Sequence, residues 1–111
     1  MKGAFLGEFE QLVLLAVAHL NAKGYGITIQ REIRRRTGRS PTLGAVYATL
    51  SRLEDKGYLV SSLGESTAER GGRAKRLFGL RPAGARALRR SREALDRMWN
   101  GIEPKPRAEE P

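Results

Sequence analysis

Residues 40–63 read SPTLGAVYATLSRLEDKGYLVSSL, and they carry the clearest structural signals in the 111-residue chain. Apolar side chains recur in its first half at helical spacing, at Leu43, Val46, Leu50 and Leu53. Ser40 is a favourable helix N-cap, and Pro41 suits the first helical position because that position needs no amide hydrogen. The pattern predicts a helix that ends near Lys56-Gly57, followed by a strand over residues 58–63.

The side of this helix opposite the apolar stripe carries mainly small residues. Its members are Ala45, Ala48 and Arg52 at the centre, flanked by Thr42, Gly44 and Thr49, with Tyr47 at the edge of the stripe. Small side chains let a helix backbone approach DNA closely, and Thr and Arg side chains reach base edges or phosphates. Gly44 costs an ordinary surface helix about 1 kcal/mol relative to alanine, so close approach explains this glycine better than stability does.

The segments on either side of this stretch predict the remaining elements. Residues 5–20 are predicted to form a helix from the spacing of Phe5, Phe9, Leu12, Ala16 and Leu20. A second helix is predicted over residues 26–37. Residues 75–80 are predicted to pair with residues 58–63 as a hairpin with a long loop, and a last helix is predicted from Pro82 to about Gly101.

The order helix, helix, helix, strand, strand, helix predicts a mainly α-helical fold with a small β-hairpin, the winged helix-turn-helix. In such a fold the second helix of the turn motif enters the major groove of DNA. We expect a winged helix-turn-helix DNA-binding domain over residues 1–80 and a dimerisation helix over residues 81–102. Residues 103–111, which hold three prolines, are expected to form a disordered tail.

The helix predicted from Pro41 to about Lys56 is the one expected to enter the major groove, and we call it the reader helix. Positively charged side chains are numerous beside it. The net charge of +9 favours an anionic partner, with nucleic acid as the first candidate. The hairpin carries Arg70, Arg73, Lys75 and Arg76 around Gly71-Gly72, and these cations suit the phosphate backbone or the minor groove of DNA. Charges of this kind also solvate a loop and deter edge pairing, which is the alternative interpretation. Arg39, beside Ser40, is predicted to add a further phosphate contact.

The composition excludes several classes of chemistry. The chain has no cysteine and one histidine, His19, so we expect no metal site and no cofactor. Because no nucleophile–base pair, paired carboxylate site or phosphate-cradling loop stands out, we do not expect an enzyme. The apolar run over residues 12–18 is too short to span a membrane and does not fit a signal peptide, so we expect a cytoplasmic protein with no membrane partner.

Two predicted helices carry more apolar surface than one small domain buries. The first is apolar nearly all round, and the last has Leu88, Leu95 and Ile102 seven positions apart, with Ser91 and Met98 at the intervening seam positions. We expect a homodimer with an interface formed by Phe5, Phe9, Leu12, Leu88, Leu95, Met98 and Ile102. The alternative is a monomer in which the first helix is a central core helix.

Several separated stretches together resemble the PadR-type transcriptional regulators. They are Tyr25-Gly26 with Ile27 and Ile29, residues 43–50 (LGAVYATL), residues 53–59 (LEDKGYL), residues 72–80 (GRAKRLFGL), and Gly84. The resemblance covers about residues 5–100, and the chain length is similar to that of the short-tailed subgroup. This chain has Ala48 where the family usually has proline and Arg81 where it usually has threonine.

The resemblance implies a homodimeric bacterial repressor of a nearby operon, often one for efflux or detoxification, that binds a palindromic operator in double-stranded DNA. It implies that Tyr47 touches the DNA backbone. It also implies that Trp99, with Met98 beside it, stacks on a small planar aromatic effector at the dimer interface, with a packing role for Trp99 as the alternative. The alternative function is a non-specific nucleic-acid-binding module, architectural or RNA-binding, although the chain has few aromatic residues for base stacking.

Overall fold

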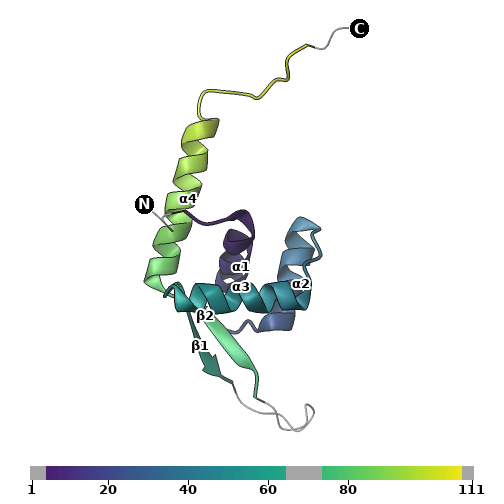
Figure 1. Ribbon diagram of the computed structural model, residues 1–111, viewed down its shortest axis with the longest axis vertical. Coiled ribbons are helices and arrows are strands. Elements are labelled where there is room, and N and C mark those ends of the chain that lie inside the picture. The colour runs from purple at the N-terminus through teal and green to yellow at the C-terminus, as the bar shows by residue number, and fades with distance from the viewer. Residues whose placement is uncertain (1–4, 65–73, 109–111) are drawn as a thin grey trace.

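The computed structural model describes residues 5–64 and 74–108. Within these ranges the elements are α1 (Glu8–His19), α2 (Gly26–Thr37), α3 (Leu43–Asp55), β1 (Leu59–Leu63), β2 (Arg76–Leu80) and α4 (Pro82–Trp99) (Figure 1). The predicted order of helices and strands, and the mainly α-helical winged fold, are confirmed. No described helix is both long enough and apolar enough to cross a membrane.

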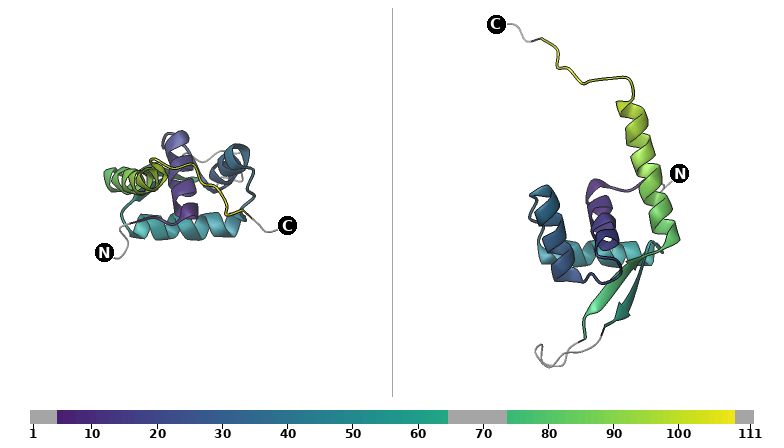
Figure 2. Two further views of the ribbon diagram at one scale, coloured as in Figure 1. Left: turned by 90° about the horizontal axis from the view of Figure 1, so that it is seen from above. Right: turned by 180° about the vertical axis from the view of Figure 1, so that it is seen from behind.

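The core lies where α1, α2 and α3 meet above the hairpin. Seen from above, α1 stands between α2 and α4, and α3 runs across the same side of all three (Figure 2). The largest fully buried side chains come from α1, α2, α3 and β1 and include Leu14, Ile29, Leu50, Leu53 and Leu59. Phe78 of β2 is also buried in this cluster, so the hairpin is packed against the helices at its base.

The prediction for α1 was wrong at its start, and the sequence pattern does not indicate which of its faces is buried. The helix begins at Glu8, and Phe5 precedes it with 61% of its surface exposed. Val13, Leu14 and Val17 face the core, whereas Phe9 and Leu12 are only partly buried. A helix that is apolar nearly all round gives no periodicity with which to choose a face, so only its neighbours decide which side is buried.

The start of α3 also differs from the prediction. Thr42, not Ser40, is the N-cap, and its Oγ1 accepts a hydrogen bond of 3.1 Å from the amide of Ala45. The carbonyl of Pro41 accepts a hydrogen bond of 2.8 Å from Nε2 of Gln30 in α2. Gln30 therefore holds Pro41 in the connecting loop, and the helix starts two residues later than the local signals indicate.

The two strands pair antiparallel, with Leu59 opposite Leu80 and Leu63 opposite Arg76. The amide of Phe78 donates a hydrogen bond of 2.9 Å to the carbonyl of Gly24, so residue 24 adds a third, single-residue strand position beside β2. This bridge ties the hairpin to the turn that precedes α2.

The last helix packs on the domain at its start and projects from it at its end (Figure 1). The amide of Arg81 donates to the carbonyl of Tyr58 at 3.0 Å, and the buried hydroxyl of Ser91 accepts from the amide of Leu6 at 3.2 Å. Ser91 therefore lies against this chain's own N-terminal segment rather than on an exposed seam. The helix ends at Trp99, so Ile102 lies beyond it, and residues 103–108 form neither helix nor strand.

Candidate nucleic-acid interface

The outward side of α3 consists of small residues around one cation. Gly44, Ala45, Ala48 and Arg52 are all exposed, as is the capping residue Thr42. A Cβ atom added to Gly44 would meet no atom within 4 Å, so packing within the chain does not require a glycine there. The structure therefore leaves a smooth helical surface that another molecule can approach closely.

Thr49 does not belong to this surface. Its side chain is 2% exposed, and its Oγ1 accepts a hydrogen bond of 3.2 Å from Nη2 of Arg52. The prediction that Thr49 lies on the outward side was wrong because the residue borders the buried stripe at Val46 and Leu50. The hydroxyl does not face outward; it accepts the hydrogen bond that orients the Arg52 guanidinium.

Tyr47 lies at the edge of the outward side, with 48% of its surface exposed. Its ring lies over Gly26, the first residue of α2, because a Cβ atom on Gly26 would be 2.4 Å from Cζ of the tyrosine. The phenol is thus placed between α3 and the start of α2. A tyrosine hydroxyl at such a position is a suitable donor to a phosphate oxygen.

Two further cations, Lys75 and Arg76, lie where β2 begins, at the loop end of the hairpin. Nζ of Lys75 lies 4.3 Å from the centre of the Tyr25 ring, a cation–π contact. Nη1 of Arg76 donates to the hydroxyl of Ser61 at 2.8 Å, and that hydroxyl donates to Glu54 at 2.6 Å. Arg70 and Arg73, predicted to contact DNA from the loop, lie outside the described residues.

Arginines at the end of α2 surround one largely buried carboxylate. Glu32 is hydrogen-bonded by both Arg35, at 2.8 Å, and Arg36. The Arg36 hydrogen bond, followed by that of Arg35, outweighs the effect of burial and holds the pKa of Glu32 below its ordinary value. Two of the arginines near the reader helix thus have an intramolecular partner.

Arg39 and Ser40 are exposed in the loop between α2 and α3. Nη1 of Arg39 lies 2.5 Å from Oε1 of Glu8, at the start of α1. Arg39 is therefore exposed as predicted, but it is paired with an acidic residue that the sequence pattern does not connect to it. The pairing joins residues that are 31 positions apart in the chain.

Lys56 is a candidate contact that the sequence pattern does not identify. It follows α3 directly, and its Nζ lies 3.1 Å from Oε2 of Glu10. Burial raises the pKa of Glu10, but the Gly7 amide, Lys56 and the positive charge of Arg52 more than offset this, so the pKa is below its ordinary value. Glu8 and Glu10 thus place two carboxylates among the cations beside α3.

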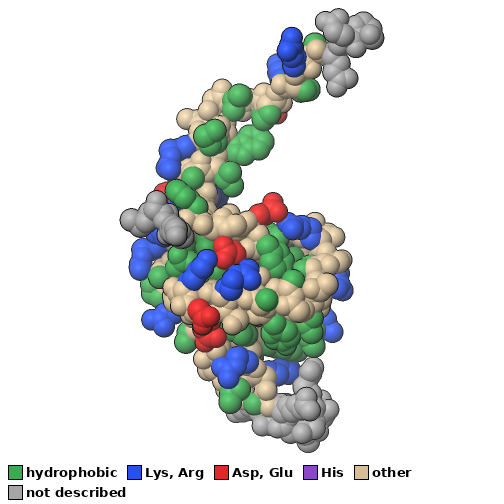
Figure 3. All heavy atoms as spheres, in the orientation of Figure 1, with side chains coloured by type: hydrophobic (Ala, Val, Ile, Leu, Met, Phe, Trp, Pro, Cys, Tyr) green, Lys and Arg blue, Asp and Glu red, His purple; other side chains and the backbone are tan. Residues whose placement is uncertain are grey.

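Viewed over α3, the molecule shows Lys and Arg side chains spread across this face, with acidic side chains directly beside some of them (Figure 3). The same view shows hydrophobic side chains on the projecting part of α4. They include Leu95, Met98 and Trp99, which are 54%, 77% and 57% exposed. The projecting part of α4 therefore carries exposed apolar side chains away from the charged residues around α3.

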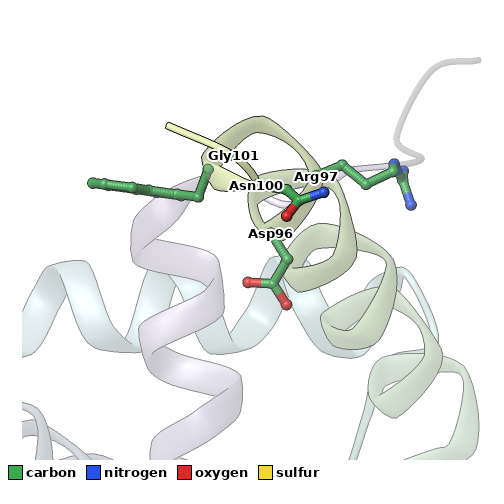
Figure 4. Close-up of a pocket in the computed structure, with 5 residues that line it drawn as sticks. Asp96, Arg97, Asn100 and Gly101 are labelled. Carbon is green, nitrogen blue, oxygen red and sulfur yellow. The ribbon is translucent and has the colours of Figure 1, made fainter. Parts of the chain in front are cut away.

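An apolar groove of about 510 Å³ runs between α1 and α4 and is lined in part by Leu15, Leu95 and Trp99. The tip of α4 offers a second hollow, lined by Asp96, Arg97, Trp99, Asn100 and Gly101. There the side chain of Arg97 points away from that of Asp96, so these residues do not close around a ligand (Figure 4). Within residues 5–64 and 74–108, no group of three His, Cys, Asp or Glu side chains is placed to hold a metal ion.

Comparison with solved structures supports the fold. A PadR family transcription regulator from Clostridium difficile R20291 superposes with a TM-score of 0.67 at 21% identity, covering 83% of this chain and 91% of that one. A PadR family transcriptional regulator from Eggerthella lenta DSM 2243 gives 0.66 at 21% identity, covering 85% and 81%. F93 from STIV, a winged-helix DNA-binding protein, gives 0.69 at 12% identity, covering 89% and 99%.

Comparison of sequences gives the family. No curated protein matches the chain significantly. The model of the PadR-like family of transcriptional regulators matches residues 14–90, which is more than half of the chain and covers the second half of α1, all of α2 and α3, the hairpin and the first half of α4. The family consists of transcriptional regulators, and two of the solved structures above are regulators of the same family. The chain belongs to the PadR-like family of transcriptional regulators.

Proposed function

We propose that this regulator represses a nearby operon by binding a palindromic operator in double-stranded DNA as a homodimer. Two copies of α3 would enter successive major grooves about one helical turn apart. The outward residues of α3, with Thr42, Arg39, Ser40 and Tyr47 around them, would contact bases and phosphates. Lys75 just before β2, with Arg70 and Arg73 in the loop, would contact the backbone.

The observation that carries this proposal is the exposed glycine in the first turn of α3. Gly44 has no neighbour within 4 Å that an alanine would disturb. Within the free protein, Gly44→Ala should therefore be tolerated and should gain up to about 1 kcal/mol of helix propensity. A glycine at a position where alanine would be more stable is explained by close approach of the partner.

The test combines selection and substitution. Duplexes bound by the purified protein are recovered from random DNA, and the affinity of Gly44→Ala and Arg52→Ala for the recovered site is compared with that of the wild type. We expect an enriched palindrome, weaker binding by both variants, and an unchanged or higher melting temperature for Gly44→Ala. An absence of enrichment, together with equal affinity for all duplexes, would favour the architectural or RNA-binding alternative.

The dimer is proposed from the exposed apolar surface. Leu95 and Met98 on α4 are mostly exposed, and Phe5 near α1 is 61% exposed, although each is apolar. Phe9, Leu12 and Leu88 lie partly buried at the edge of the core. Burial of this apolar surface against a second copy would stabilise the dimer by a free energy of roughly 25 cal/mol per Å² of surface removed from water.

Release by a small planar aromatic effector is proposed for the groove that contains Trp99. The indole is 57% exposed beside Leu15 and Leu95, and a second copy would cover its open side. Titration with acridine, a planar dye, should quench Trp99 fluorescence and release bound DNA. Trp99→Leu should abolish dye binding without loss of DNA binding. If dye binding persists in Trp99→Leu, the effector role of this residue is wrong.

A further inference from the structure

Three consecutive residues at the start of α2 contact β2, Lys75 and Tyr47, and the last two belong to the proposed DNA interface. The carbonyl of Gly24 accepts the amide of Phe78 in β2 at 2.9 Å. The ring of Tyr25 lies under the ammonium group of Lys75 at 4.3 Å. The Cα atom of Gly26 lies against the tip of the Tyr47 side chain in α3.

The contact at Gly26 requires a residue without a side chain. A Cβ atom there would lie 2.4, 2.5 and 2.6 Å from Cζ, Oη and Cε1 of Tyr47, closer than real Cβ atoms approach. Gly26 itself is buried, and its φ is not in the left-handed region, so the tyrosine and not the backbone conformation explains the glycine. An added methyl group would push the phenol away from its place.

The segment that makes these contacts is itself held firmly. The amide of Tyr25 donates to Oγ1 of Thr28 at 3.0 Å, and that hydroxyl donates back to the carbonyl of Tyr25 at 3.1 Å. The capping interaction fixes the first turn of α2. Residues 24–26 are thus one rigid unit that joins the hairpin base to the reader helix.

We propose that Tyr25 and Gly26 are positioning residues that hold Lys75 and the Tyr47 phenol in one register, so that both reach the backbone of the same duplex. The inference rests on the proposed function, since it assumes that Lys75 and Tyr47 contact DNA. The physical reason is that a duplex is stiff, so contacts from two separate elements add together only if their spacing is set in advance. Neither positioning residue needs to touch DNA.

A double-mutant cycle tests the role of Gly26, with a duplex recovered by the wild-type protein from a random pool as the probe. Gly26→Ala should lower affinity about tenfold, as expected when a hydrogen bond to a charged phosphate is lost. In a Tyr47→Ala background the same substitution should change affinity less than twofold. Gly79→Ala is the matched control, because its added methyl group meets nothing closer than 3.6 Å and its affinity should be unchanged.

A second cycle uses Tyr25→Leu and Lys75→Ala and keeps the proposal testable if Gly26→Ala fails to fold. Tyr25→Leu should weaken binding in the wild type but not when Lys75 is already alanine. Equal losses in both backgrounds, or no loss from either positioning variant, would overturn the inference while the effects of Tyr47→Ala and Lys75→Ala leave the DNA interface standing. If neither Tyr47→Ala nor Lys75→Ala changes affinity, the proposed contacts themselves are wrong.

Discussion

Oε2 of Glu10 lies 3.1 Å from Nζ of Lys56, and this ion pair joins the first turn of α1 to the residue that follows α3. A similar pair, Glu8 with Arg39, joins the start of α1 to the loop before α3. The two acidic residues are therefore ion-paired with cations at both ends of the reader helix. In the proposed complex these carboxylates compete with DNA phosphates for the same side chains.

Glu10→Gln should consequently raise DNA affinity, because Lys56 becomes available to the backbone. The expected gain is about twofold to fivefold, the strength of one exposed ion pair. The dependence of log affinity on log salt should steepen by about one if Lys56 gains a phosphate. Glu93→Gln on α4 makes the same charge change away from α3 and should have a smaller effect, and a loss of affinity in Glu10→Gln would contradict the prediction.

Gly84→Ala should destabilise the fold. A Cβ atom at Gly84 would lie 2.4 Å from the carbonyl oxygen of Tyr58, a backbone atom that accepts the Arg81 amide and cannot move freely. We expect a loss of about 1–3 kcal/mol, the usual cost of forcing extra atoms into a packed contact. Urea unfolding measures the loss, and Gly44→Ala, which has open space, should show none.

Ala22→Gly should stabilise the protein. The turn between α1 and α2 places Asn21 and Ala22 at φ values of 53° and 67°, and the amide of Lys23 donates to the carbonyl of Leu20 at 3.0 Å. Alanine is strained in this region and glycine is not, although glycine adds entropy to the unfolded chain. The net gain should be about 0.5 kcal/mol in the unfolding free energy. A lower melting temperature would show that the positive φ is not a source of strain.

Leu95→Glu should break the proposed dimer. The residue is 54% exposed on the projecting part of α4, so a charge there leaves the single domain intact but opposes burial against a second copy. Sedimentation should show a monomer with an unchanged circular dichroism spectrum. A persistent dimer would place the interface elsewhere. Glu93→Lys, on a different side of α4, is the control for a charge change on this helix.

Acid should remove the contribution of Glu32 to stability. Its folded pKa lies below the ordinary value of 4.5 because Arg36 and Arg35 donate to it. A carboxyl group with a lowered pKa stabilises the fold above its unfolded pKa, and this contribution disappears as the pH falls through the folded pKa. The difference in unfolding free energy between wild type and Glu32→Gln should therefore be greatest near neutral pH and shrink below about 4.5. A difference that does not change with pH would contradict the assignment.

The sequence alone determined the order of the elements, because their signals are local. The apolar stripe from Val46 to Leu53, the bounds of α2 and the pairing of the two strands all follow from side-chain periodicity and from glycine and proline at the breaks. The exposed small side of α3 also follows from this periodicity, apart from Thr49. These features depend on residues within a few positions of one another, so they are visible without the fold.

The tertiary structure alone decided the rest. The buried face of α1, the cap at Thr42, the burial of Thr49 and the contact of Gly26 with Tyr47 each depend on a neighbour from another element. The pairing of Glu10 with Lys56 joins residues 46 positions apart. No local pattern encodes such contacts, because they arise only when packing of the apolar core has set the distances between the helices.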